Sequence, residues 1–495
     1  MSLVMGVDVS TTATKALVVD EAGRVVSQGA ASYDYDIPRP LWTEQDPLVW
    51  WDAAVEAIRL ALTGGVDAGQ IEAVGLTGQM HGSVLLDGKG DIVRPAILWN
   101  DQRTGEECDE IRARIGRERL IEICGNDALT GFTAPKLLWV ANHEPDHWAR
   151  VETILLPKDY LRFRMTGKRA IDVAGGSGTI LFELAMRTWS PEILDALSID
   201  PSRCPPTFEG PAVAGTISRD GATATGLREG TPVVGGGGDQ SANAVGVGAV
   251  TSGVMALSLG TSGVVFATSD GPAIEPEGRV HSFCHAVPGK WHMMGVMLSA
   301  AGSLRWLRDA IAPEAEFSEL VAGAGEVPPG AEGLIFLPYL SGERTPHPDP
   351  LARGAFVGLT LGHDMRHLTR AVLEGVAFGL RDGLDLMVAA GVKRPDSITA
   401  SGGGIRSPLW RQILADVLGA RIDTVATEEG AAYGAAMLAG VGARWHHTVE
   451  AASDAWVSTE PTAKPSDDSQ VYASLHERYS ALYPALKPTF SGLDV

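Results

Sequence analysis

Short apolar runs alternate with polar turns at the start of the chain. The apolar run 3–7 leads into the polar segment 8–15, and a second apolar run at 16–19 precedes the turn 20–23. Runs of this length, bounded by Ser, Thr, Asp and Gly, are typical of strands joined by tight turns. The pattern therefore predicts three antiparallel strands between residues 3 and 30.

Helical periodicity begins directly after this region. Residues 47–62 place Leu48, Val55 and Ile58 on one face, and Asp46 precedes them in the position of an N-cap. Strands are expected at 71–76, 83–87 and 96–100, and another helix at 104–115. Strands followed by strand–helix alternation indicate an α/β layered domain.

The remaining pattern divides the chain near residue 248. A strand at 231–234, a glycine turn at 235–238 and a helix at 241–247 close the first part, which gives domains 1–247 and 248–495. Further helices are expected at 299–310, 367–390, 408–418 and 431–439, the last rich in Ala and Gly and so tightly packed. The polar segment 457–469 is interpreted as a surface linker before a final helix at 470–483.

Composition restricts the class of protein. The chain has 495 residues, which is too long for one core, and 45% of its residues are hydrophobic. Its net charge of −21 argues against binding to nucleic acid or to an anionic membrane. No secretion signal is recognised, no apolar run reaches the roughly 20 residues of a membrane span, and four cysteines are scattered. We expect a cytoplasmic protein with reduced thiols and no nucleic-acid or membrane partner, with a homodimer as one assembly it could form.

Two turns rich in small hydroxyl residues stand out, one in each half. The first contains Thr11 and Thr12 before Lys15, and the second contains Gly260 and Thr261. Open backbone N–H groups in such turns form a concave site for anions. Neither turn has the GxxxxGK[ST] pattern of a Walker A loop, and each alone is compatible with an ordinary hairpin. The pair, one per half, predicts a polyphosphate held between two like-built domains.

Asp239 follows four consecutive glycines and stands at the start of the expected helix, next to Gln240. Glycines let the backbone approach a ligand closely, and a helix start favours anions. An ordinary N-cap after a flexible turn is the alternative. A carboxylate beside bound phosphate could instead accept a proton from a substrate hydroxyl, and the helix end should keep it ionised at neutral pH.

Three weaker motifs remain. Met80 and His81 lie in a loop between two strands, where they would face a ligand or act structurally. The triple glycine that includes Gly403 and Gly404, before Ser407, suits close approach of a nucleoside or a tight strand–helix connection. The segment 281–285 has two His and one Cys, but nothing nearby adds ligands at zinc-like spacing, so no metal is expected there.

One such hairpin in each half of the chain resembles the arrangement found in the sugar kinase/Hsp70/actin superfamily. From residue 3 to about residue 440 the chain is similar to the FGGY carbohydrate kinases, and within them to the bacterial xylulokinases. The matching segments are 42–47, 77–82, 97–101, 156–160, 236–240, 257–263, 281–286, 337–347 and 370–375. The resemblance implies an α/β fold of two actin-like, ribonuclease H-like ATPase domains flanking a central cleft.

The resemblance also implies roles for individual residues. Asp239 would be the general base, and Asp8 would act at the phosphates and Mg²⁺. The remaining assignments are sugar contacts by Met80, His81, Asp239 and Gln240, phosphate contacts by Thr11, Thr12, Lys15, Gly260 and Thr261, and nucleoside contacts by Gly403, Gly404 and Ser407. Close relatives often carry Asn at the position of Gln240, which bears on the choice of sugar.

The implied activity is transfer of a phosphoryl group from ATP, with Mg²⁺, to D-xylulose, giving D-xylulose 5-phosphate. Two alternatives stay open. One is an FGGY kinase for ribulose, another ketose or a polyol such as glycerol. The other is a non-catalytic sugar-binding protein on the same scaffold, which would have no chemical need for Asp8 and Asp239 together.

Overall fold

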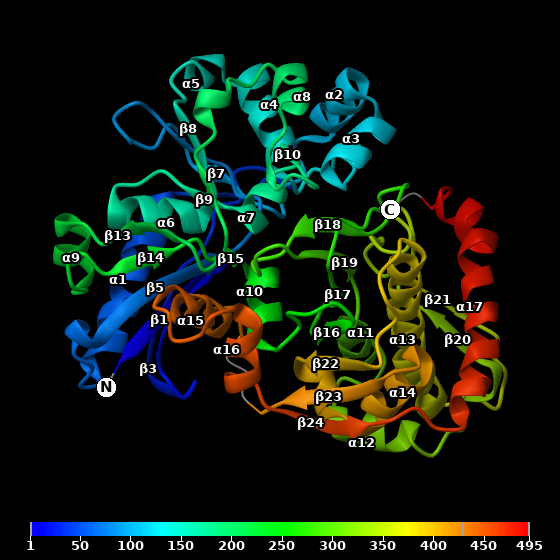
Figure 1. The fold of residues 1–495 in the computed structure, drawn as a ribbon. Coiled ribbons are helices and arrows are strands. Elements are labelled where there is room, and N and C mark those ends of the chain that lie inside the picture. Colours follow the sequence, from blue (N-terminus) through cyan, green and yellow to red (C-terminus); the bar gives the residue numbers. More distant parts are fainter. Residues whose placement is uncertain (1, 427–429, 494–495) are drawn as a thin grey trace.

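The computed structural model describes residues 2–426 and 430–493, which form two α/β halves, each built around a seven-stranded sheet (Figure 1). The first sheet has the order β13 (Val213–Thr216), β14 (Pro232–Val234), β5 (Ile71–Gly78), β1 (Leu3–Val9), β2 (Ala13–Asp20) and β3 (Val25–Ser32), with β15 (Gly237–Gly238) also paired to β5. The second has the order β18 (His281–Cys284), β19 (Trp291–Met297), β17 (Gly263–Ser269), β16 (Val254–Leu259), β22 (Ser397–Ser401), β23 (Arg421–Val425) and β24 (Thr459–Ala463).

The two sheets repeat one topology. In the first, β1 is antiparallel to β2 and parallel to β5; in the second, β16 is antiparallel to β17 and parallel to β22. Each hairpin therefore stands beside the parallel strands of its own sheet. The predicted antiparallel strands between residues 3 and 30 are confirmed, as is the α/β class.

Helices cover the sheets and connect them. Those of the first half are α1 (Pro47–Thr63), α2 (Gly105–Ile115), α3 (Arg117–Cys124), α4 (Thr133–His143), α5 (Pro145–Trp148), α6 (Pro157–Thr166), α7 (Val173–Ser177), α8 (Pro191–Ala196), α9 (Arg219–Thr225) and α10 (Asp239–Gly246). Those of the second are α11 (Ala301–Ile311), α12 (Phe317–Ala324), α13 (Met365–Ala389), α14 (Pro408–Leu418), α15 (Gly430–Gly442), α16 (Val449–Trp456) and α17 (Asp468–Phe490).

Short strands and single helical turns complete the described residues. The strands are β4 (Glu44–Gln45), β6 (Val84–Leu86), β7 (Ala96–Ile97), β8 (Thr153–Leu155), β9 (Ile171–Asp172), β10 (Phe182–Glu183), β11 (Thr188–Trp189), β12 (Thr207–Phe208), β20 (Ile335–Leu337) and β21 (Ala355–Val357). The 3₁₀ turns are η1 (Ala68–Gln70), η2 (Pro201–Arg203), η3 (Ala331–Gly333) and η4 (Gly403–Arg406).

Helix α1 begins where its sequence indicates. The Asp46 carboxylate accepts a hydrogen bond from the Leu48 amide at 2.9 Å, and Pro47 occupies the first turn, where no amide donor is needed. The apolar face of α1 buries Trp50 and Ile58 against the first sheet. The predicted helix at 47–62 is confirmed.

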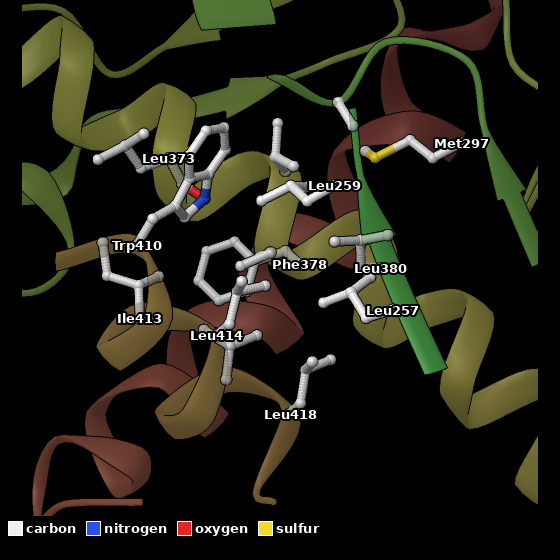
Figure 2. Packing of buried hydrophobic residues seen from close by; sticks show 14 of the residues in the cluster. Leu257, Leu259, Met297, Leu373, Phe378, Leu380, Trp410, Ile413, Leu414 and Leu418 are labelled. Atoms are coloured by element: carbon white, nitrogen blue, oxygen red, sulfur yellow. The ribbon is translucent and has the colours of Figure 1, made fainter. Parts of the chain in front are cut away.

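The core of the second half lies between β16, α13 and α14 (Figure 2). Trp410 is buried there, and its indole Nε1 donates to the Leu373 carbonyl at 3.0 Å. This bond fixes the start of α14 against α13. The preceding glycine turn is therefore attached to a rigid part of the core.

Helix α15 returns to the first half and packs on β1, β5 and α10 (Figure 1). A Cβ added to Gly434 would lie 1.8 Å from the Ala242 carbonyl oxygen, so only glycine permits this contact between α15 and α10. The expectation that 431–439 is a tightly packed helix is confirmed. The division of the chain near residue 248 stays a prediction.

The polar segment 457–469 is not a linker, and that prediction is wrong. Residues 459–463 form β24, which pairs antiparallel with β23 at the edge of the second sheet. An edge strand that is largely exposed and contains Pro461 has no alternation of apolar residues for the sequence pattern to detect. The last helix is also longer than the expected 470–483. Within the described ranges no helix is long and apolar enough to cross a membrane.

Candidate active site

Asp8 and Asp239 lie at the same edge of the first sheet. In the strand register, Asp8 pairs with Thr77 across β1 and β5, and Gly237 pairs with Thr77 from the other side. These three strands are parallel, so their carboxyl ends meet at one edge, where ligands bind in open α/β sheets. Asp239 follows two residues after Gly237 as the first residue of α10.

Glycines are required where the chain turns into α10. Gly236 has φ +72°, and a Cβ there would lie 1.8 Å from the Leu76 carbonyl oxygen. At Gly238 a Cβ would lie 2.7 Å from Met80 Cγ. The turn therefore passes close to β5 and to the Met80 loop, and it carries Asp239 into the same space.

A buried ionic cluster supports this turn from behind. The Arg162 guanidinium donates to the Gly235 carbonyl and forms an ion pair with Asp159 at 2.6 Å. Lys158 pairs with both Asp159 and Asp172. Buried charges that are paired in this way are costly to break, so the cluster fixes the backbone just before the catalytic candidate.

Burial raises the pKa values of both carboxyls. For Asp239 it raises the pKa to about 6, against the opposing effect of the Gln240 amide, which donates at 2.8 Å. For Asp8, burial and then the negative charge of Asp239 raise the pKa to about 7, and Lys15 opposes them. Asp239 is still about nine-tenths ionised at pH 7, but burial outweighs the effect expected of the helix end. A base with a pKa near the working pH is suited to proton transfer.

The first of the two hydroxyl-rich turns, which contains Thr11 and Thr12, is held by side chains around it. Thr11 Oγ1 donates to Gln79 Oε1 at 3.3 Å and accepts from Trp99 Nε1 at 3.0 Å. Thr12, next in the turn, is exposed, and Lys15 lies opposite Asp8 in the strand register. The Thr11 hydroxyl therefore has a structural role in addition to any contact with phosphate.

The second hydroxyl-rich turn, which contains Gly260 and Thr261, packs on the start of α11. The carbonyls of Gly260 and Thr261 accept from the amides of Ala301 and Ala300, both at 2.9 Å. The Thr261 side chain is exposed. Both turns thus present hydroxyl groups outward while other bonds hold their backbones.

A cavity of about 170 Å³ brings the four predicted sugar-binding residues together. Met80 and His81 line one part of it, and Asp239 and Gln240 another. Sequence reasoning missed the other lining residues, which come from both halves: Trp99, Leu129, Gly131, Phe132, Ser262, Val264, Met294, Val296 and Arg344.

His81 is held in a neutral form. Its Nδ1 lies 2.7 Å from the Gly178 carbonyl, which can only accept, so Nδ1 carries the proton and Nε2 remains an acceptor. Burial, and then the nearby charge of Lys136, lower its pKa well below the ordinary range. The backbone has φ +67°, and Lys136 Nζ donates to the His81 carbonyl at 2.9 Å. This uncommon conformation is stabilised by a buried lysine that the sequence pattern did not indicate.

A second cavity, of about 310 Å³, also adjoins Asp239. Asp239 and Gln240 line both cavities; the residues specific to this one are Asn243, Val247, Ser258, Ser401, Gly402, Val425, Gly430 and Ala431. Gly403 and Gly404 follow directly in η4. The Ser407 hydroxyl instead accepts from the Trp410 amide at 3.1 Å and caps α14.

No group of three or more His, Cys, Asp or Glu side chains able to hold a metal occurs among the residues that the structure places. His281 and His285 are instead hydrogen-bonded, His281 Nδ1 lying 3.1 Å from Asn126 Oδ1 and His285 Nε2 lying 3.1 Å from the Ala249 carbonyl. Mg²⁺ in phosphate-transfer sites needs only one or two carboxylates together with phosphate oxygens and water. Asp8 fits that requirement, since its Oδ1 is buried and has no hydrogen-bond partner within the described part of the chain.

Comparison with known proteins gives matches over both halves. The N-terminal domain of the FGGY family of carbohydrate kinases matches residues 3–246, and its C-terminal domain matches residues 255–443. The xylulose kinase of Escherichia coli (strain K12) is 46% identical over 440 residues, which cover 89% of this chain and 90% of that protein. The structure of a xyloylose kinase from Brucella ovis has a TM-score of 0.92 at 40% identity and covers 98% of this chain and 100% of its own. That of a gluconate kinase from Lactobacillus acidophilus has a TM-score of 0.94 at 27% identity and covers 99% of both chains.

Proposed function

The chain belongs to the FGGY family of carbohydrate kinases, and from this premise we propose that it phosphorylates D-xylulose at the C5 hydroxyl with ATP. One observation carries the proposal: Asp239 lines both cavities, so a single carboxylate faces the space for a sugar and the space for a nucleotide. Phosphoryl transfer depends mainly on positioning and on neutralising charge, which this arrangement can supply.

In the proposed reaction, the C5 hydroxyl lies beside Asp239 and its oxygen attacks the γ-phosphorus in line with the leaving oxygen of ADP. The hydroxyl proton passes to the Asp239 carboxylate as the new P–O bond forms. Mg²⁺, when bound at Asp8, would neutralise phosphate charge. The exposed hydroxyls of Thr12 and Thr261, one from each hairpin, would contact the phosphates from opposite halves.

Gly402, with φ +95°, lines the larger cavity beside Ser401, and we assign this cavity to the nucleoside. Because Gly403 and Gly404 follow in the same turn, they would lie near the adenosine moiety. Ser407 would act indirectly, since its hydroxyl caps the helix that follows the turn. We further propose a cytoplasmic location, which the requirement for ATP and the four free cysteines favour.

A coupled assay of ADP release tests the proposal across D-xylulose, D-ribulose, gluconate and glycerol, with the Asp239→Ala variant as the matched control. We expect weak ATP hydrolysis without sugar, strong stimulation by D-xylulose, and the largest kcat/KM for that ketose. A larger kcat/KM for gluconate or glycerol would contradict the substrate while leaving a sugar kinase. If no sugar stimulates ADP release, the chain is a binding protein.

A further inference from the structure

Arg344 brings a positive charge from the second half into the smaller cavity. Its backbone is fixed to the end of β19 through its neighbours. Glu343 Oε1 accepts from the Leu298 amide at 2.9 Å and from the Arg344 amide at 2.7 Å, and the Thr345 amide donates to the Val296 carbonyl at 3.1 Å. The side chain is thus held at the cavity wall by a rigid loop.

The Arg344 guanidinium makes no hydrogen bond or ion pair with any residue that the structure describes. The neighbouring Glu343 does not neutralise the charge of Arg344 fully. Burial raises the pKa of Glu343 to about 8, so that its carboxyl is mainly protonated at pH 7. Burial also lowers the pKa of Arg344, but guanidinium groups in proteins stay charged. The side chain is half-buried at the wall of the cavity, and its donors are unused by the protein, so they are open to a ligand that accepts hydrogen bonds.

Arg344 acts at the histidine end of the cavity. Its loop is fixed to β19, which pairs with β18 at His281, and the centroid of the Phe132 ring lies 5.0 Å from that of His81 and 5.5 Å from that of His281. In agreement with this placement, the charge of Arg344 contributes to lowering the pKa of both histidines. A sugar with its reacting hydroxyl at Asp239 would therefore extend its other end toward Arg344 and His81.

The chemistry of the proposed substrate indicates what lies at that end. A 2-ketopentose closes into a furanose ring by adding its C5 hydroxyl to the C2 carbonyl. The C5 hydroxyl is consequently free to react only in the open chain, where the carbonyl is exposed. A carbonyl oxygen accepts but does not donate, which matches a guanidinium that donates but does not accept. His81 Nε2, an acceptor, suits a neighbouring hydroxyl.

We propose that Arg344 recognises the C2 carbonyl of the open-chain ketose and so distinguishes ketoses from polyols. This inference rests on the proposed function. A polyol places a hydroxyl where the ketose has its carbonyl, and a guanidinium, which only donates, offers the proton of that hydroxyl no acceptor. The second half thereby contributes to sugar specificity, and a bound ketose would connect the two halves.

The test compares D-xylulose with xylitol, which differs from it only at C2. In Arg344→Met we expect the KM for D-xylulose to rise between about 10- and 150-fold, as for loss of a charged hydrogen bond. The inhibition constant of xylitol and the KM for ATP should change less than about threefold, and Arg344→Lys should restore part of the loss. Calorimetric titration with each sugar gives the same comparison without turnover. Arg305→Met, an exposed arginine of α11, is the matched control and should leave all values unchanged.

Equal losses for D-xylulose and xylitol, or no loss for either, would overturn the role of Arg344 in reading the carbonyl. If the wild-type protein does not phosphorylate D-xylulose, the proposed function itself fails. The thermal midpoint of Arg344→Met, compared with the wild type, identifies a variant that has lost its fold; Arg344→Gln then replaces it in the same comparison.

Discussion

Replacing Asp239 with Asn should inactivate the protein and at the same time stabilise it. Burial holds the pKa of Asp239 at about 6, compared with 3.8 for an unperturbed carboxyl. That difference lowers the free energy of unfolding by about 3 kcal/mol at neutral pH, because the folded state disfavours the charged form of the carboxyl. Asn has the same shape and can still accept a hydrogen bond from the Gln240 amide. The cost of burying a charge is therefore removed, while the packing around the side chain is kept.

The stability difference between the variant and the wild type should depend on pH in a definite direction. A carboxyl whose pKa is raised by folding stabilises the native state below its unfolded pKa of 3.8, and that contribution is lost as the pH rises through about 6. The stability gap between Asp239→Asn and the wild type should therefore be about 3 kcal/mol at pH 8 and about half of that at pH 5. Turnover should fall by about 10²- to 10⁴-fold, as for the loss of a general base.

Denaturant unfolding followed by tryptophan fluorescence at pH 8 and pH 5 measures the gap. Asp364→Asn is the matched control with the opposite sign. The Asp364 carboxylate caps α13, and hydrogen bonds from Arg366 and His367 hold its pKa below the ordinary range, so that variant should lose stability at pH 8 and lose less at acidic pH. An Asp239→Asn protein that is less stable than the wild type at pH 8, or equally stabilised at both pH values, would refute the reasoning. More than about a tenth of wild-type turnover would remove Asp239 from the role of base.

Three other outcomes are expected. First, kcat/KM for the sugar should fall as the pH drops from 8 to 5, because the pKa of Asp239, about 6, lies in this range and a protonated carboxyl cannot accept the hydroxyl proton; a flat profile would contradict it. Second, His81→Ala should raise the KM for sugar at least about tenfold and leave the KM for ATP within about threefold; equal losses would make the loop purely structural. Third, Gly236→Ala, at φ +72°, should cost at least about 1 kcal/mol of stability and most of the turnover, whereas Gly271→Ala, with open space around it, should cost neither.

The sequence predicted those parts of the fold that local signals determine. Asp46 and Pro47 mark the start of α1 to within a few residues. The run of glycines before Asp239 predicts a turn without reference to any other part of the sequence. The edge strand β24 has no such signal, because its pairing with β23 depends on contacts from a distant part of the sequence. Its polar, exposed residues are common to linkers and edge strands alike.

The same distinction explains the site. Met80, His81, Asp239 and Gln240 lie in motifs that can be recognised one at a time, and the structure places all four in one cavity. Arg344 lies in a segment that matches the family, but nothing in the segment indicates which side chain lines the cavity. That depends on how the loop is fixed to β19, and no periodicity in the sequence records this contact.

The contact between Gly434 of α15 and Ala242 of α10 has a mechanical consequence. It is made by backbone atoms, so its spacing does not depend on the rotamers of neighbouring side chains. A side chain added at position 434 would therefore meet the backbone of α10 and could be accommodated only if the two helices moved apart. Asp239 begins one helix, and Gly430, at the wall of the larger cavity, begins the other. The spacing of this backbone contact therefore helps to set how far Asp239 lies from the opposite wall of the larger cavity, and a larger side chain at position 434 would change that distance although the residue lines neither cavity.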